Sequence, residues 1–317
     1  MALITAKWGN SLEKFEDLQE QLVTKIEVDL NPILRTKTAL ITGSVHYKNL
    51  NHVSGKQLEE TWPRAKKYLE KAVDRLSGWG FSGKKCMSSD YIVVIMAYCH
   101  YLEEEKKASL DWGKLKYWGR IVNANGHFGS GSNTVADLDL KTLRDNGVSG
   151  LFDRLGDLNK LRYSKKDIIG VQRSSGIYKT LFMALLEDNI GDWEGNGRRI
   201  MSRTLNRANE IDEHHIFPKA LLKEMRPDLK DDEINQIANI APIHKDTNLG
   251  IGKKRPSEYR HAMSEADLKA HLVDFSDGKD LEENYEQFID VRAQAIADRL
   301  NAFLGLGSDN SDSPLTP

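Results

Sequence analysis

The sequence predicts a mostly α-helical protein with one short pair of strands in its C-terminal half. Apolar residues recur three and four positions apart in long segments such as 12–26 and 281–304, which places them on one face of a helix. Two runs depart from that spacing. Residues 211–217 and 237–243 are short, apolar and strand-like, and Pro218 ends the first of them.

Length and composition are those of an ordinary globular protein. The chain of 317 residues is long enough for two domains, and 39% hydrophobic with 29% charged residues allows a substantial core. Because the formal net charge is only -2, a nucleic-acid partner would need a local basic face. Cations cluster in two places, which are Arg198, Arg199, Arg203 and Arg207, and the run Lys253–Arg255.

A change in composition indicates where one domain gives way to the next. Residues 159–176 are basic and polar, between apolar helical segments. We therefore expect a helical domain over 1–160 and a second domain over 161–304, with its core at 205–260. Residues 305–317 are rich in Ser, Asp and Pro, which is typical of a disordered tail.

Individual helices are expected wherever the apolar spacing is regular. Thr61 is a candidate N-cap with Pro63 in the first turn, and the helix of 12–26 should end before Asn31-Pro32. Further helices are expected at 90–101, 115–122, 136–143, 150–158, 177–186 and 265–273.

Cysteine usage and the absence of long apolar runs bear on location. Cys86 and Cys99 lack metal-binding spacing and lie in apolar surroundings, so we expect buried free thiols in a reducing compartment. The sequence has neither a signal-peptide pattern nor an apolar run of membrane-spanning length. These features predict a cytoplasmic protein with no membrane partner.

A Gly- and Ser-rich stretch at 123–133 contains His127. Such a loop can cradle phosphate when it joins a strand to a helix, but the segment before it is expected to be helical. A helix–helix connector is therefore favoured, and contact of Arg120 and His127 with a DNA backbone stays open as the alternative.

Most candidate chemistry lies between residues 211 and 256. His214 and His215 are adjacent in the first strand-like run, so their side chains should point to opposite faces. One can then hold a divalent metal ion while the other accepts a proton from water, since histidine titrates close to working pH. Asn248 follows the second strand-like run and would approach the same point. Taken singly, each residue has a structural explanation, and it is their joint order that favours a site.

That order resembles the ββα-metal nuclease signature, also called HNH or His-Me finger. His-His-Ile-Phe-Pro at 214–218 is followed by Asn239 and, nine positions later, by Asn248. More narrowly, residues 205–260 resemble the C-terminal nuclease domain of GmrSD-like modification-dependent restriction endonucleases. The resemblance implies a helical domain followed by a ββα-metal module surrounded by helices.

The resemblance also implies a role for each matching residue. His215 matches the general base that activates water, and His214 and Asn248 match the metal ligands. Asn239 matches the structural asparagine that pins the loop between the strands. Lys219, Lys253, Lys254 and Arg255 are candidate nucleic-acid contacts. The expected cofactor is Mg²⁺, with Mn²⁺ as a substitute.

Members of that family begin with an NTP-hydrolysing sensor domain, whose motif is absent from these residues. We therefore expect a sensor domain or partner subunit outside this chain. The expected function is DNA endonuclease with little sequence preference, acting in restriction of foreign or modified DNA. The alternatives are a catalytically degenerate nucleic-acid-binding module, a helical partner-docking subunit of a larger defence complex, and an RNase.

Overall fold

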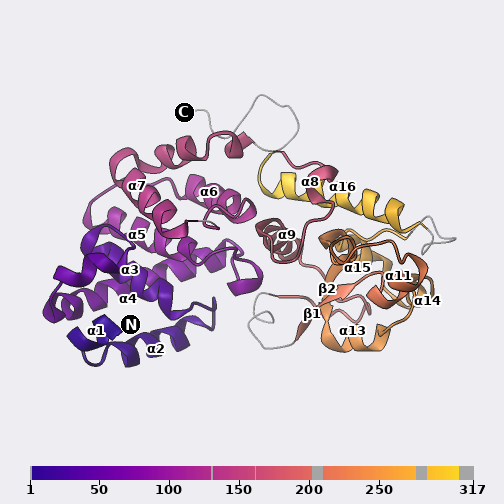
Figure 1. Cartoon of the computed structure of the whole chain (residues 1–317), viewed down its shortest axis with the longest axis horizontal. Helices are drawn as coiled ribbons and strands as arrows, with labels where there is room; N and C mark the ends of the chain where they lie inside the picture. The colour runs from indigo at the N-terminus through magenta and orange to yellow at the C-terminus, as the bar shows by residue number, and fades with distance from the viewer. Residues whose placement is uncertain (1, 130, 161, 202–209, 276–283, 307–317) are drawn as a thin grey trace. The chain divides into compact units, whose positions relative to one another are not determined.

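The computed structural model describes residues 2–129, 131–160, 162–201, 210–275 and 284–306. Within these ranges the chain is mostly helical, and a single two-stranded antiparallel sheet lies in its C-terminal part (Figure 1). The predicted fold class is confirmed at this level. The described residues divide into two compact units, which cover 2–156 and 157–306. Arg203, Arg207 and most of the predicted tail lie outside the described residues.

The first unit is a helical assembly built around one almost fully buried helix. That helix, α5 (Tyr91–Glu105), is apolar on nearly every side and packs against α3, α4 and α7. A helix that is hydrophobic all round belongs in a core. The other helices of this unit are α1 (Ala2–Lys7), α2 (Ser11–Leu22), α3 (Leu30–Thr42), α4 (Gly55–Gly78), α6 (Trp112–Ala124) and α7 (Ser132–Leu155). Short 3₁₀ turns of this unit lie at Tyr47–His52 and Gly83–Lys85, and a third, Gly156–Lys160, starts at its last residue.

The predicted start of α4 was wrong. The helix begins two turns earlier than Thr61, at a capping box in which Ser54 and Gln57 satisfy each other's backbone N–H groups. Thr61 instead donates its hydroxyl to the Gln57 carbonyl inside the helix, and Pro63 is an interior residue. The helix α3 was also missed, because Pro32 lies in its first turn, where the missing N–H costs nothing.

Other expectations for the first unit hold. Within 123–133, the described residues 125–129 and 131 lie between α6 and α7, as a helix–helix connector would. The two expected helices at 136–143 and 150–158 correspond to α7, whose backbone leaves helical geometry at Gly147 (φ 66°). Cys86 and Cys99 are buried, and both are thiols outside any disulfide in the described residues. None of the helices in the described ranges is long and apolar enough to cross a membrane.

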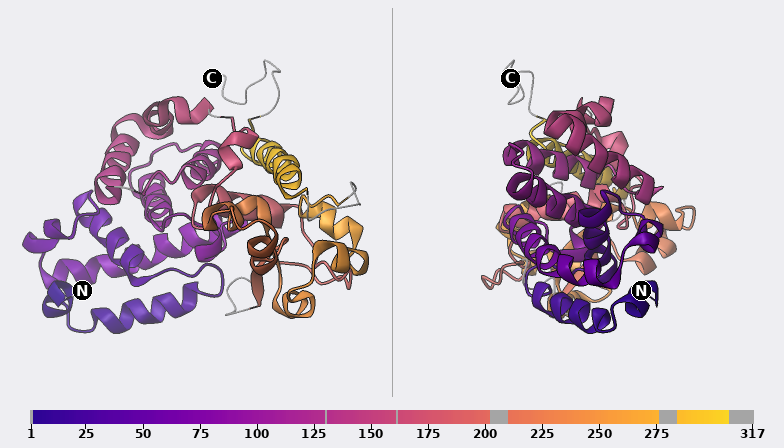
Figure 2. Two further views of the ribbon diagram at one scale, coloured as in Figure 1. Left: turned by 45° about the vertical axis from the view of Figure 1, so that its right-hand side comes forward. Right: turned by 90° about the vertical axis from the view of Figure 1, so that its left-hand side faces the viewer.

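The second unit holds the small sheet. Strand β1 (Ile211–His215) pairs antiparallel with β2 (Ile240–His244), and α13 (Lys245–Ile251) follows β2 directly. The remaining helices are α8 (Lys165–Ile168), α9 (Gly176–Glu187), α11 (Lys219–Met225), α12 (Asp231–Ile234), α14 (Pro256–Tyr259), α15 (Glu265–Ala270) and α16 (Tyr285–Phe303), with 3₁₀ turns at Ile237–Asn239 and Arg260–Ala262. The long helix α16 packs against α8 and α9 (Figures 1 and 2).

One buried arginine ties α16 to the sheet. Arg292 is 2% exposed and donates hydrogen bonds to the carbonyls of Ile237, Ala238 and Ile240, and to that of His271. Burial lowers the pKa of Arg292 only to about 10, so the guanidinium stays charged at neutral pH. The carbonyls of Ile237, Ala238 and Ile240 lie at the entry to β2, and Arg292 therefore holds in place the strand that leads into α13.

Candidate functional site

The strand register decides which candidate side chains can meet. His214 lies opposite Ala241, and His215 lies opposite Ile240, at the end of β1. Alternation along the strand puts Asp212 and His214 on one face and Glu213 and His215 on the other. Because α13 starts at the residue after β2, Asn248 lies about one turn beyond the sheet.

Asn248 links two side chains on the same face of β1. Its Oδ1 lies 2.7 Å from Nδ1 of His214, and its Nδ2 donates to Oδ2 of Asp212 over 2.9 Å. Since the amide nitrogen is committed to Asp212, Asn248 presents its oxygen to the ring. His214 must therefore carry its proton on Nδ1 and donate it to Asn248.

His214 is buried and uncharged. It is 3% exposed, and burial lowers its pKa to about 4. The rings of Trp193 and Tyr259 meet it edge to face, with centroids 5.4 Å and 5.9 Å away. Its Nε2 is buried and has no hydrogen-bond partner among the described residues. The ring thus has a free nitrogen that can take up the proton if Nδ1 gives it away.

His215 is half-buried on the opposite face of β1. Its Nε2 lies 2.9 Å from Oδ1 of Asn235, which can only accept, so the ring proton lies on Nε2. The lone pair is then on Nδ1, and no hydrogen bond to that atom is found in the described ranges. Burial lowers the pKa of His215, and the nearby charges of Arg173 and Lys219 act in the same direction. A neutral imidazole with a free Nδ1 is the form that a general base requires.

Asn239 connects the two ends of the segment between the strands. It is fully buried, its Oδ1 accepts from the Phe217 N–H over 2.9 Å, and its Nδ2 donates to the carbonyls of Phe217 and Ile234. A buried amide whose donors and acceptor are all used fixes the backbone around it. Asn239 thereby holds residues 217 and 234, which follow His215 and precede Asn235.

The four predicted nucleic-acid contacts differ in whether their side chains already bind other groups of the protein. Lys219 forms an ion pair with Asp231 over 2.8 Å, and Lys254 donates to the Gly250 carbonyl. Lys253 and Arg255 are exposed, and their side chains make no ion pair within the described part of the chain. Lys253 and Arg255 are therefore the more available of the four.

A buried carboxylate fixes the start of α13, and sequence reasoning did not identify it. Asp192 is 1% exposed, accepts from the backbone N–H of His244 over 3.1 Å and accepts from the hydroxyl of Thr247. Arg198 adds a second connection, because it donates to Nδ1 of His244 and to Asp246. The segment containing Asp192 and Arg198 therefore braces the turn that carries Asn248.

Near Asn248 the described residues offer two candidate ligands for a divalent metal ion. No group of three or more His, Cys, Asp or Glu side chains that could bind a metal is present in the described ranges. His214 and Asn248 supply one imidazole nitrogen and one amide oxygen, and Mg²⁺ commonly keeps several waters beside one or two protein ligands. Binding at Nδ1 requires its proton to leave, and the unpartnered Nε2 can carry that proton.

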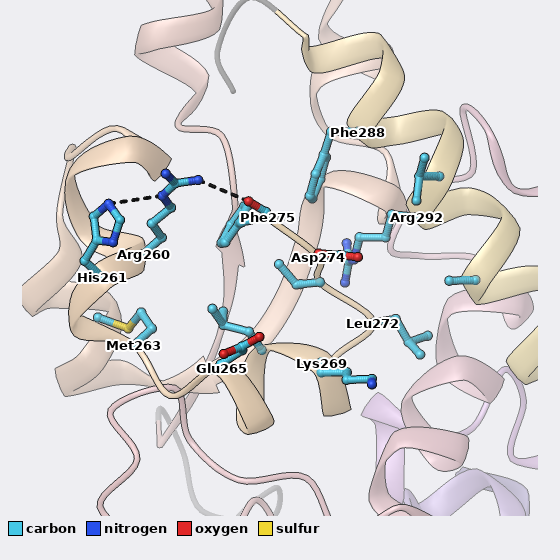
Figure 3. A pocket seen from close by; sticks show the side chains of 14 residues that line it. Arg260, His261, Met263, Glu265, Lys269, Leu272, Asp274, Phe275, Phe288 and Arg292 are labelled. Carbon is cyan, nitrogen blue, oxygen red and sulfur yellow. Dashed lines mark hydrogen bonds between the residues drawn. The ribbon is translucent and has the colours of Figure 1, made fainter. Parts of the chain in front are cut away.

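One hollow of the second unit is not lined by any of the candidate site residues. It has a volume of about 810 Å³ and lies between α15, α16 and the segment from Arg260 to Phe275 (Figure 3). Arg260 donates to the Phe275 carbonyl at its edge. None of the sequence-predicted site residues lines this hollow, and residues 276–283, which continue from Phe275, lie outside the described part of the chain.

Sequence reasoning missed three partners of the site. Asp212 had a usable signal, because it stands two positions before His214 and strand alternation puts both on one face. Asn235 and Asp192 had none, since they reach the site from segments whose path depends on the tertiary fold.

Comparison with known proteins adds one partial relative. No family model matches the chain. A stretch of 120 residues is 29% identical to the uncharacterized protein MJ0686 of Methanocaldococcus jannaschii, and the match covers 29% of this chain and 20% of that protein. The chain thus spans about a fifth of the length of this relative.

Proposed function

We propose that this protein is a metal-dependent endonuclease that hydrolyses phosphodiester bonds of DNA. The observation that carries the proposal is the pairing of His214 Nδ1 with Asn248 Oδ1 at 2.7 Å. The next residue after His214 is His215, a half-buried histidine whose Nδ1 accepts no hydrogen bond within the described residues. In this proposal His214 and Asn248 hold Mg²⁺ or Mn²⁺, His215 is the general base, and Asn239 is a positioning residue.

Each residue has a defined task in the reaction. Nδ1 of His215 accepts a proton from the attacking water, while Asn235 accepts from Nε2–H and keeps the ring oriented. Asp212 holds the Asn248 amide so that its oxygen faces the metal position. A bound divalent ion would stabilise the negative charge on the phosphate and on the leaving oxygen.

A supercoiled-plasmid assay tests the proposal directly. The protein should relax or linearise the plasmid in Mg²⁺ or Mn²⁺ and should stop when excess EDTA is added. His215→Ala should abolish cutting while the circular-dichroism spectrum stays unchanged. His52→Ala is a matched control, because His52 is an exposed histidine of the first unit. Relaxed and linear products distinguish nicking from double-strand cleavage.

Two outcomes would refute parts of the proposal. Undiminished cutting by His215→Ala would exclude His215 as the general base. Cutting in excess chelator would exclude a role for a metal ion. Gel-shift binding without cleavage in Mg²⁺, Mn²⁺ or Ni²⁺ would identify a nucleic-acid-binding module instead. Parallel assays on RNA and on modified and unmodified plasmids test whether DNA is the preferred backbone and whether modification directs the cut.

A further inference from the structure

The helix that carries Asn248 presents an unusual outward face. In α13, Lys245, Asn248 and Leu249 are spaced i, i+3 and i+4 and therefore share one side, while Thr247 and Ile251 are buried on the other. Leu249 is 69% exposed, more than any other large apolar side chain in the described ranges. A leucine so exposed beside a candidate ligand contributes little to the core of the free protein.

Gly250, the next residue, has no internal reason to be glycine. It is exposed and helical, its φ is not positive, and a Cβ added there would meet nothing within 4 Å. Glycine inside a helix is unfavourable relative to alanine. A bare backbone is useful where a partner must approach closely. Leu249 thus protrudes from the helix, and Gly250 beside it has no Cβ, so its backbone is exposed next to the Lys254 ammonium that donates to its carbonyl.

The charges around Leu249 and Gly250 favour a polyanion. Lys245, Lys253 and Arg255 are exposed and form no ion pairs within the described residues. The acidic residue of α13, Asp246, pairs with Arg198 over 2.6 Å, and Glu258 accepts from the Arg255 backbone N–H. Cations on both sides of an apolar side chain suit a duplex, whose phosphates flank the apolar sugars and base edges of a groove.

We infer that Lys245, Leu249 and Gly250 of α13, together with Lys253 just beyond the helix, form the contact surface for duplex DNA. This inference rests on the proposed function and adds a recognition element to it. Leu249 presses against base-pair edges, Gly250 lets the sugar–phosphate backbone approach the helix, and Lys245 and Lys253 contact flanking phosphates. Asn248, which shares the side of Lys245 and Leu249, then faces the strand to be cut.

This contact has a consequence for sequence preference. Lys245, Leu249 and Gly250 carry no amide or carboxylate side chain that reads base identity through paired hydrogen bonds. An apolar wedge instead favours steps that unstack easily, and pyrimidine–purine steps are the most deformable. Cleavage by the wild-type protein should therefore be enriched near TA and CA steps in duplex DNA.

Two variants test the surface with the full-length protein. Leu249→Ser should lower duplex cleavage at least about tenfold and flatten the enrichment at pyrimidine–purine steps. Gly250→Leu should lower duplex cleavage by a similar factor while the melting temperature stays unchanged or rises. Val291→Ser and Gly78→Leu are the matched controls, because Val291 is 53% exposed on α16 and Gly78 is an exposed helical glycine with open space.

The outcomes separate this inference from the proposed function. Suppose that the wild type cuts with metal and that both α13 variants cut equally well with the same step preference. The inferred contact surface is then wrong, while the proposed nuclease function is supported. If Leu249→Ser lowers single-strand cleavage as much as duplex cleavage, the duplex contact is wrong. If the wild type does not cut, gel shifts with duplex DNA test the contact surface instead. Duplex binding that Leu249→Ser weakens supports the surface, and unchanged binding refutes it.

Discussion

Oδ1 of Asn248 lies 2.7 Å from Nδ1 of His214, although the two residues are 34 positions apart in the sequence. Their meeting depends on the register of β1 against β2 and on α13 starting directly after β2. Asp212 accepts from the other end of the same amide. The candidate metal position is therefore supported from the strand and from the helix at once.

Removal of the Asn248 amide should weaken metal use more than folding. In Asn248→Ala we expect cleavage at limiting Mg²⁺ to fall roughly 100-fold, with partial recovery at high Mg²⁺, because a metal ligand is lost. A Mg²⁺ titration of plasmid cleavage measures this. Asn10→Ala is the control, since Asn10 is an exposed asparagine of the first unit whose side chain makes no cap hydrogen bond. Equal Mg²⁺ dependence in wild type and Asn248→Ala would exclude Asn248 as a ligand.

Asp212 should act through Asn248. Asp212→Ala frees the amide to rotate, and we expect a loss of about 10- to 100-fold in apparent metal affinity with a smaller change in cleavage at saturating metal. Isothermal titration with Mn²⁺ measures the affinity. Asp298→Ala serves as the control, because Asp298 is an exposed carboxylate on α16. An unaltered Mn²⁺ affinity in Asp212→Ala would contradict the positioning role.

Asn239 should be needed for stability. Asn239→Ala leaves the Phe217 N–H and the carbonyls of Phe217 and Ile234 without their partner, and we expect the second unit to lose about 3 kcal/mol of unfolding free energy. Urea unfolding followed by the fluorescence of Trp193, the sole tryptophan from 157 onward, measures the loss. A change below about 0.5 kcal/mol would mean that Asn239 does not brace this segment.

The buried carboxylate of Asp192 should couple stability to activity. Asp192→Ala removes the acceptor for the His244 N–H and the Thr247 hydroxyl, so we expect a loss of about 2 kcal/mol together with slower cleavage. Asp192→Asn keeps an acceptor oxygen and should be milder in both assays. If both variants cut as fast as the wild type, the start of α13 does not depend on Asp192.

Acid should destabilise the second unit through His271. Burial lowers the pKa of this fully buried histidine to about 4 from 6.5, against the raising effects of Asp267 and Asp192, and Arg292 adds to the lowering. Between pH 6.5 and 4 the unfolded state therefore binds a proton on His271 that the folded state does not bind. The free energy of unfolding has its full value above pH 6.5 and falls by up to about 3 kcal/mol as the pH drops toward 4.

His271→Gln should reduce this pH dependence, since glutamine does not titrate and can still donate to the Gly191 carbonyl that Nε2 contacts at 2.8 Å. Urea unfolding by Trp193 fluorescence between pH 4 and 7 provides the measurement, and His261→Gln, at an exposed histidine, is the control. The same pH dependence in His271→Gln and wild type would show that another group is responsible.

Much of the helical fold followed from local pattern. Continuous apolar runs located α5 and α9, which are buried on nearly every face, and the three- and four-residue spacing located α16, which buries one face. The start of α4 and the whole of α3 escaped because proline was read as a boundary, whereas Pro32 and Pro63 both lie within helices. The start of α4 is set instead by the local capping box of Ser54 and Gln57, which leaves Thr61 and Pro63 inside the helix.

The sequence by itself determined which residues stand together in the motif and that His214 and His215 point apart. Only the tertiary structure decided which atoms meet: Asp212 with Asn248, Asn235 with His215, and Asp192 with the start of α13. The physical reason is that strand register and loop paths are set by long-range packing. A shift of one residue in β1 would turn His214 away from Asn248 without changing any local pattern.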